Sequence, residues 1–212
     1  MRDTAERGFK RTIVEYLQDQ MNRVVEAYRL GLELEWEAEE VELLFTMLPH
    51  MHSAIGMAIV EEALSEEEIP GAIAWAHQRA RDSASTITRT TRGAVLSALR
   101  DVAIYAATGV ALVQAVSLLR SLLETVFAEV RAEAISITEI TRAFTAATML
   151  RADKYRQMGY DVTLIWETNR DYKVCPVCDA LDMRRQGDGW IEGPPAHVNC
   201  RCRMTIEFNE RV

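Results

Sequence analysis

The chain has 212 residues, of which 49% are hydrophobic and 26% are charged, and its formal net charge is −8. This composition is typical of a folded protein with a sizeable core and argues against a disordered chain. The negative charge also argues against a general attraction to nucleic acid or to anionic membrane surfaces.

The N-terminal segment predicts a long amphipathic helix. It is charged and lacks both an apolar core and a small-residue cleavage site, so we expect no secretory signal. From Phe9 to Tyr28 apolar residues recur every three or four positions, which places them on one helix face. Gly31 follows directly and is predicted to end this helix.

Two shorter helices are predicted next. The apolar run Trp36–Leu48 is expected to end at Pro49, because proline disrupts a helix interior. A further helix is predicted over Met51–Leu64. Ser65 resembles an N-cap followed by acidic residues, but Ile69–Gly71, which contains a proline, is expected to interrupt that start.

The middle of the chain is also predicted to be helical, with one interruption. A helix is expected over Ala72–Arg81, with Ile73 and Trp75 in the core. The segment Ser83–Thr91 is rich in Ser and Thr and is predicted to be a connection, and another helix is predicted over Gly93–Ala107.

Val102–Leu119 contains 18 residues without a charge, the lower limit for a membrane-spanning helix. Its alanine and polar residues, and Gly109 near its middle, favour two buried helices that meet at this glycine. The second of these is predicted over Val110–Phe127. A long helix over Val130–Met158, closed by Gly159, is predicted to follow.

The pattern changes after residue 159. Residues 161–169 alternate and are rich in β-branched and aromatic side chains, which predicts a strand, and Cys202–Phe208 predicts a second one. Residues 171–195 are predicted to form loops. We therefore predict a mainly α fold, with a multi-helix body at residues 1–159 and a small, loop-rich α+β subdomain at residues 160–212. A piece of that size needs a staple beyond its hydrophobic core.

All four cysteines lie in this C-terminal segment, together with one of the four histidines. The pair Cys175 and Cys178 has the two-residue spacing that lets a tight turn present two sulfurs to one metal ion. Cys200 and Cys202, two apart, point the same way in an extended segment. Cys175, Cys178 and Cys200 are predicted zinc ligands, and Cys202 competes with His197 for the fourth place.

One structural zinc ion is the predicted cofactor, and three alternatives stay open. The first alternative is disulfide pairing, for example Cys175–Cys202 or Cys178–Cys200, and the second is a set of buried thiols without a metal. A catalytic zinc is the third alternative, but it would need an open ligand position and a general base.

The same residues resemble a known family. The segments Trp166-Glu-Thr, Val174-Cys-Pro-Val-Cys, Pro194-Pro195 and His197-Val-Asn-Cys-Arg-Cys resemble the C-terminal signature of phage Mu F-like minor head proteins, the head morphogenesis family. Upstream, residues 131–139 are similar to the family's helix that ends in Ile-Ala-Arg-Thr-Glu, although Ser136 and Ile137 stand where that motif has Ala-Arg. Gly109 matches a glycine that opens the preceding helix, so the resemblance covers residues 93–208.

The resemblance implies a non-enzymatic minor capsid protein of a tailed-phage head. Its expected partners are portal and capsid or scaffold proteins. The expected location is the virion, either the capsid interior or the portal vertex, after assembly in the bacterial cytoplasm. A zinc module that contacts packaged DNA through Arg184, Arg185, Arg201 and Arg203 is the alternative. A metal-dependent hydrolase is disfavoured because His197 has no second histidine nearby in sequence.

Two polar features remain. Thr138 and Glu139 lie in the middle of a predicted helix, where a solvated or helix-packing role is favoured over a functional one. Between Gly31 and Glu68 there are many glutamates and no Lys or Arg. This acidic run is either a solvated helix face, the favoured interpretation, or a docking face for a basic partner.

Overall fold

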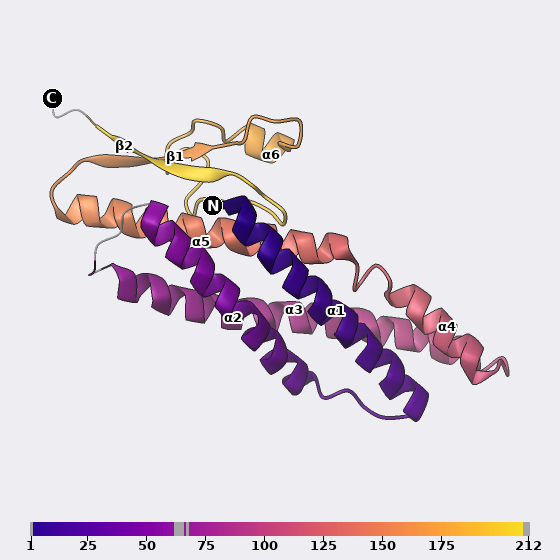
Figure 1. Ribbon diagram of the computed structural model, residues 1–212. Helices are drawn as coiled ribbons and strands as arrows, with labels where there is room; N and C mark the ends of the chain where they lie inside the picture. Colours follow the sequence, from indigo (N-terminus) through magenta and orange to yellow (C-terminus); the bar gives the residue numbers. More distant parts are fainter. Residues whose placement is uncertain (1, 62–65, 67, 210–212) are drawn as a thin grey trace.

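Long helices make up most of the described chain. The computed structural model describes residues 2–61, 66 and 68–209. The elements in chain order are α1 (Arg2–Leu30), α2 (Trp36–Glu61), α3 (Ile69–Ala106), α4 (Leu112–Leu123), α5 (Glu129–Gln157), β1 (Val162–Glu167), α6 (Pro176–Asp179) and β2 (Arg203–Phe208). Figure 1 shows the small sheet lying over α5, on one side of the helices. The predicted mainly α fold with a small α+β C-terminal part is confirmed.

Helix α1 is amphipathic as predicted. Its buried residues include Phe9, Ile13 and Leu17, which pack with buried side chains of α2 such as Leu43 and Met47 in one hydrophobic cluster. The same cluster extends through α3, α4 and the first half of α5. Burial of this apolar face, at about 25 cal/mol per Å², is the main stabilising contribution to the helical layers.

Glycines end two helices where they were predicted to do so. Gly31 follows α1 and Gly159 follows α5, with φ of 69° and 84°. These positive φ values favour glycine because it has no Cβ to clash with the backbone. Both helix ends are therefore set locally, independently of packing elsewhere.

Pro49 does not end a helix, contrary to the prediction. Helix α2 continues through it from Trp36 to Glu61. An interior proline costs about 3 kcal/mol because it removes one hydrogen bond and crowds the preceding turn. Its ring is exposed, while Met47 and Met51 on either side are fully buried. Packing of these flanking turns therefore holds both halves in one helix. Leu64 and Ser65 of the predicted boundary lie outside the described residues.

The predicted connection Ser83–Thr91 is also helical, within a single helix α3 of 38 residues. Pro70 lies in the first turn of α3 and begins the helix rather than interrupting it. The hydroxyl of Thr91 donates to the carbonyl of Ile87 at 2.7 Å, one helical turn earlier. Such back-bonding lets hydroxyl side chains sit inside a helix and pack against its neighbours.

Alanine, rather than large apolar residues, forms the buried face at the start of α3. Ile73 is 42% exposed and Trp75 is half-buried, so their predicted core positions are wrong. The side chains that are fully buried there are Ala72, Ala76, Ala80 and Ala84, one turn apart. Small side chains at this spacing let α3 lie close to its neighbouring helices.

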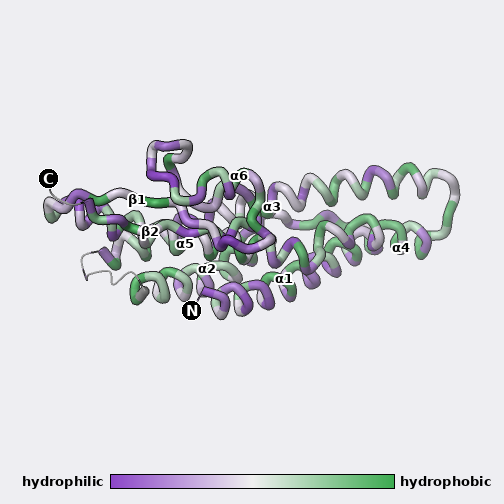
Figure 2. The backbone as a smooth tube through the Cα atoms, turned by 90° about the horizontal axis from the view of Figure 1, so that it is seen from above, coloured by the Kyte–Doolittle hydropathy of each residue, from purple (hydrophilic) through white to green (hydrophobic). Residues whose placement is uncertain are grey.

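The uncharged stretch 102–119 is split between two helices that meet at a turn, as predicted. Helix α3 ends at Ala106, α4 begins at Leu112, and Gly109 lies in the turn with φ of 82°. The expectation that both helices are buried there is wrong, since Ile104 and Val113 are 72% and 73% exposed. Figure 2 shows this hydrophobic turn (green) at one end of the molecule, where α3 passes into α4.

One helix among the described residues, α2, is long and apolar enough by length and composition to cross a membrane, over Trp36–Val60. A single such helix is weak evidence for a span, because a core helix meets the same criteria. In the structure α2 packs against α1, α3 and α5.

The C-terminal segment is built on an antiparallel pair of strands. Both predicted strands form, and they pair with Trp166 opposite Met204. Trp166 and Trp190 meet edge to face with ring centroids 5.7 Å apart, and Trp190 is buried. The predicted loop region 171–195 contains one short helix, α6. A separate hydrophobic cluster joins Trp166, Trp190 and the buried cysteines to Ala152 of α5. Whether residues 160–212 form a separate unit stays a prediction.

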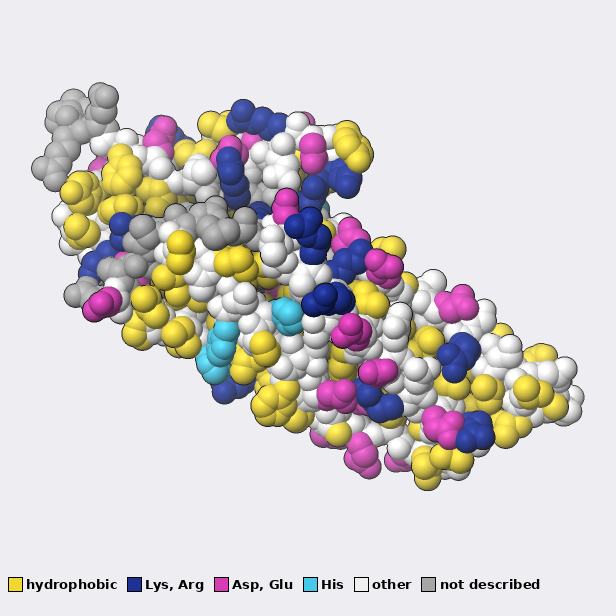
Figure 3. Space-filling view, in the orientation of Figure 1, with side chains coloured by type: hydrophobic (Ala, Val, Ile, Leu, Met, Phe, Trp, Pro, Cys, Tyr) yellow, Lys and Arg dark blue, Asp and Glu magenta, His cyan; other side chains and the backbone are white. Residues whose placement is uncertain are grey.

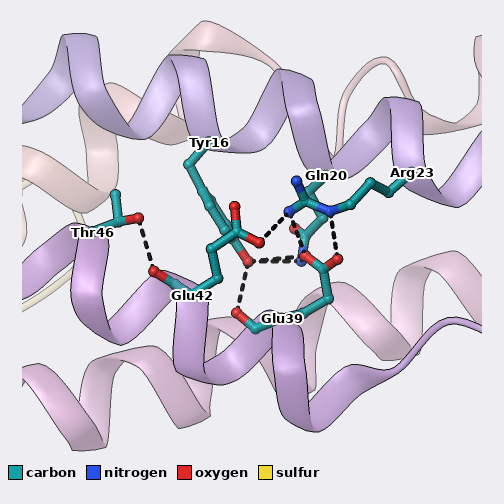
Figure 4. Close-up of polar contacts among 6 residues, drawn as sticks. All are labelled: Tyr16, Gln20, Arg23, Glu39, Glu42 and Thr46. Carbon is teal, nitrogen blue, oxygen red and sulfur yellow. Dashed lines mark hydrogen bonds and ion pairs between the residues drawn. The ribbon is translucent and has the colours of Figure 1, made fainter.

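A buried polar network fixes α1 against α2 (Figure 4). The Glu39 carboxylate is 4% exposed and accepts hydrogen bonds from Arg23 Nε at 2.6 Å and Gln20 Nε2 at 2.8 Å. Tyr16 donates to the Glu39 carbonyl at 3.0 Å, and burial, with the nearby carboxylate, raises the tyrosine pKa. Each of these polar side chains has a hydrogen-bond partner within the network, so the network also fixes the position of α1 relative to α2.

Replacing Glu39 by Ala would remove the carboxylate to which Arg23 and Gln20 donate, although the backbone carbonyl at this position would still accept from Tyr16. We expect Glu39→Ala to lower the free energy of unfolding by about 3 kcal/mol, measured by urea denaturation. Glu40→Ala is the matched control, because Glu40 has no bonded partner in the described part of the chain, and a change below about 0.5 kcal/mol is expected for it. Equal effects of the two substitutions would contradict a stabilising role for the network.

Candidate metal centre

Three short segments bring the predicted metal-binding side chains together. Cys175 immediately precedes α6 and its sulfur accepts the Cys178 backbone N–H at 3.4 Å, which closes the Cys-Pro-Val-Cys turn. His197 and Cys200 lie in the loop before β2, and Cys202 directly precedes that strand. The pairing of β1 with β2 therefore places this loop beside the α6 turn.

The five side chains form two close groups that share Cys178. His197 Nε2 lies 3.0 Å from the Cys175 sulfur and 3.1 Å from the Cys178 sulfur. On the other side, the sulfurs of Cys178 and Cys200 are 3.6 Å apart, and Cys202 completes that group. Within each group all donor atoms lie within 4.8 Å of one another, so the groups could bind a metal ion. Ligand atoms around a tetrahedral zinc are roughly 3.5–3.8 Å apart, which this spacing approaches.

The donor atoms surround a small cavity. It measures about 20 Å³ and is lined by the four cysteines and His197, with Lys173 and Arg201 among its other walls. A space of this size holds a single ion or water molecule. Cys178, Cys200 and Cys202 are buried, Cys175 is half-buried and His197 is exposed. The cavity therefore suits one ion and leaves no room for a substrate.

The histidine ring is oriented by its second nitrogen. His197 Nδ1 lies 2.8 Å from the Val198 carbonyl oxygen. In the neutral ring a proton on Nδ1 donates to this carbonyl, which leaves the lone pair of Nε2 facing Cys175 and Cys178. Metal-binding histidines are commonly held in this way.

The thiols differ in acidity. Interaction with the neighbouring Cys202 thiol, together with backbone N–H groups, lowers the pKa of Cys200 to about 5, below the usual range of a thiol. Burial raises the pKa of Cys178 to about 12, and the hydrogen bond to Cys200 raises that of Cys202. A metal ion that bound Cys178 would therefore release its proton, and affinity would fall as the pH is lowered.

Helix α5 holds the cysteine loop through backbone hydrogen bonds. The Thr138 hydroxyl accepts the Asn199 N–H at 2.8 Å, and the Thr141 hydroxyl donates to the Cys200 carbonyl at 2.7 Å. Residues three apart share a helix face, so both threonines point to the loop. From α1, Arg2 donates to the Cys202 carbonyl at 3.3 Å and also to the Thr141 hydroxyl.

Glu139 faces α3 and is 4% exposed. Arg79 donates to both of its carboxylate oxygens, at 2.7 and 2.8 Å, and Arg142 donates to one of them at 2.8 Å. A solvated role is therefore wrong for both Thr138 and Glu139. A helix-packing role is confirmed for Glu139, whereas Thr138 hydrogen-bonds the cysteine loop instead. The roles of Arg2 and Thr141 as anchors of the loop were not predicted, because each contact joins residues far apart in the chain.

The predicted basic patch is neutralised. Each of its four arginines forms an ion pair with a carboxylate: Arg184 with Asp188, Arg185 with Glu207, Arg201 with Asp171 and Arg203 with Glu167. Guanidinium groups held in such pairs have to exchange a carboxylate for a phosphate before they bind nucleic acid. The patch therefore gives little support to a DNA-binding role.

Comparisons with known proteins give one match. Residues 65–205 match a family model described as phage Mu protein F like protein. No curated protein matches the chain. No solved structure matches it. The matched residues include the anchors on α5 and all five candidate metal-binding side chains.

Loss of the Thr141 hydroxyl should weaken the metal site. Thr141→Val removes the bond to the Cys200 carbonyl, and we expect affinity for zinc, the metal predicted from the sequence, to fall about tenfold, measured by competition with a chromogenic chelator. Thr145→Val is the matched control, because Thr145 is buried one turn later on α5 and its hydroxyl has no partner among the described residues. Equal affinities for the two variants would show that the anchor does not position the loop.

Proposed function

The chain belongs to the phage Mu protein F-like family, whose members are phage head morphogenesis proteins, and on this premise we propose that it is a minor capsid protein of a tailed-phage head. The proposed partners are the portal and the capsid or scaffold proteins. The proposed location is the capsid interior or the portal vertex, reached by assembly in the bacterial cytoplasm. The family match over most of the chain carries this proposal.

We further propose that the Cys/His cluster holds one structural zinc ion. The supporting observation is the convergence of two donor groups on Cys178, around a cavity for a single ion. Zinc would hold the α6 turn to the loop before β2, which is the staple that a small, loop-rich segment requires.

The proposed ligands are Cys175, Cys178, Cys200 and His197. The Nε2 lone pair of His197 faces two of the sulfurs, and its Nδ1 is held by the Val198 carbonyl. Cys202 is then a neighbour of the ligands whose thiol lies close to the Cys200 sulfur and lowers the pKa of Cys200. Four protein ligands leave no open position for water or substrate, so the site would be structural and not catalytic.

A hydrolase has little support in this geometry. The other histidines lie on α2 and α3, where His50 stacks on Phe9 and His52 contacts His77. Within the described residues, the groups that could hold a metal are the two at Cys178. A nucleic-acid-binding module has little support either, because the arginines near the cluster are paired.

The zinc proposal predicts about one zinc ion per chain by metal analysis of protein purified under reducing conditions. Cys178→Ser should abolish binding, because Cys178 belongs to both donor groups. His197→Ala should lose zinc, whereas Cys202→Ala should retain it with lower affinity. The reverse pattern would make Cys202 the fourth ligand. Metal-free wild-type protein with oxidised thiols would contradict the proposal and favour disulfides.

The head-protein proposal predicts incorporation into particles. When the chain is co-expressed with the shell and portal proteins of its phage, we expect it to sediment with assembled particles in few copies. Particles made without the portal are the control. Incorporation that requires the portal would locate the chain at the portal vertex, and incorporation without it would locate the chain in the shell interior. A chain that stays out of particles while the purified protein cleaves nucleic acid or peptide with a metal requirement would overturn the proposal.

A further inference from the structure

We propose that the groove along the connection between α1 and α2 binds a basic, amphipathic helix of a partner protein. This groove, called here the connection groove, consists of two hollows that share residues 32–35 as a wall. The inference goes beyond the proposed function, because it assigns a surface and a chemistry to a region outside the metal centre, and largely outside the family match.

The connection groove is large enough for helix side chains. The hollow against α3 measures about 570 Å³ and reaches from Tyr28 to Leu99. The hollow between α1 and the start of α2 measures about 630 Å³. Each has the size of a ligand-binding cleft, and Leu32 and Leu34 line both of them.

Apolar side chains in this groove are uncovered. Leu30 is 56% exposed, Leu32 is 63% exposed, and Leu96 on the α3 wall is 41% exposed. Trp36 also lines the groove and is only half-buried. Neighbouring leucines and a tryptophan lining a hollow are the kind of surface that takes the apolar face of a helix.

The rim of the groove is acidic. Glu33, Glu35 and Glu37 are exposed and have no ion-pair partner among the described residues. One basic residue, Arg92, lines the α3 side, while Arg23 on the other side is held by Glu39 and Glu42. Figure 3 shows acidic side chains (magenta) beside hydrophobic ones (yellow) near the connection.

Charge complementarity therefore selects the occupant. An apolar groove with an acidic rim fits a helix that has Leu or Phe on one face and Lys or Arg on the flanks. A second copy of this chain, with a net charge of −8, would bring like charges together. Phosphate groups of nucleic acid or of anionic lipid would be repelled for the same reason.

The groove is preformed by the buried network described above. Arg23, Glu39 and Glu42 line one hollow and at the same time bind α1 to α2. Because these contacts fix the two helices on either side of the connection, a partner helix would meet a fixed surface, and less free energy would be spent on ordering it.

The test is a titration of the purified full-length protein with a fluorescent synthetic helix of about 18 residues, built from Leu, Phe and Lys. Binding is followed by the fluorescence anisotropy of the labelled helix. We expect Glu33→Lys/Glu35→Lys to weaken binding about tenfold. Asp161→Lys/Glu192→Lys is the matched control, since it changes the net charge equally at two exposed acids of the C-terminal segment, and it should bind as wild type does.

Leu96→Glu should weaken binding as well, whereas Ile191→Glu, at an exposed position outside the groove, should not.

Three results would overturn the proposal. The first is wild-type protein that does not bind the helix, and the second is a control double variant that weakens binding as much as the groove variant. The third is a helix with Ser in place of Leu and Phe that binds equally well. Sedimentation showing a dimer that Leu96→Glu dissociates would make a second copy the occupant. Because no phage particle is involved, failure here leaves the head-protein proposal untouched.

Discussion

The hydrogen bonds from α5 to the cysteine loop are the connection on which the rest of the C-terminal segment depends. That segment has two short strands, one turn of helix and a small hydrophobic cluster. Thr138 and Thr141 bond the backbone of the loop at Asn199 and Cys200, next to the sulfurs. The same helix turns Glu139 toward Arg79 and Arg142. One face of helix α5 thus packs against the other helices, and another face bonds the loop that carries the cysteine cluster.

Local signals were enough to predict the features that depend on local chemistry. Gly31 and Gly159 end helices because their positive φ needs glycine. The alternation around Trp166 predicted β1, and the spacing of Cys175 and Cys178 predicted the turn that brings their sulfurs together. In each case the residues that determine the local structure lie within a few positions of one another, so a short sequence pattern is enough to predict it.

Features that depend on packing could not be predicted in the same way. Pro49 and the segment Ser83–Thr91 have poor helix-forming tendencies, yet both lie inside helices because neighbouring helices cover the adjoining turns. Alanines, and not Ile73, fill the buried face of α3 because this helix lies close to its neighbours. That closeness is a property of the assembled fold and does not follow from local sequence. The anchors Arg2 and Thr141 were missed because their partners lie 200 and 59 residues away.

The contact between Arg2 and the Cys202 carbonyl has a consequence for the order in which the protein folds during synthesis. Arg2 in the first turn of α1 is synthesised 200 residues before Cys202. The helical layers can begin to assemble while the chain is still growing. Closure of the cysteine loop against α1 and α5, in contrast, must wait until β2 has been made. The cysteine loop therefore reaches its final position later than the helical layers do, and its thiols are accessible to metal or oxidant until then.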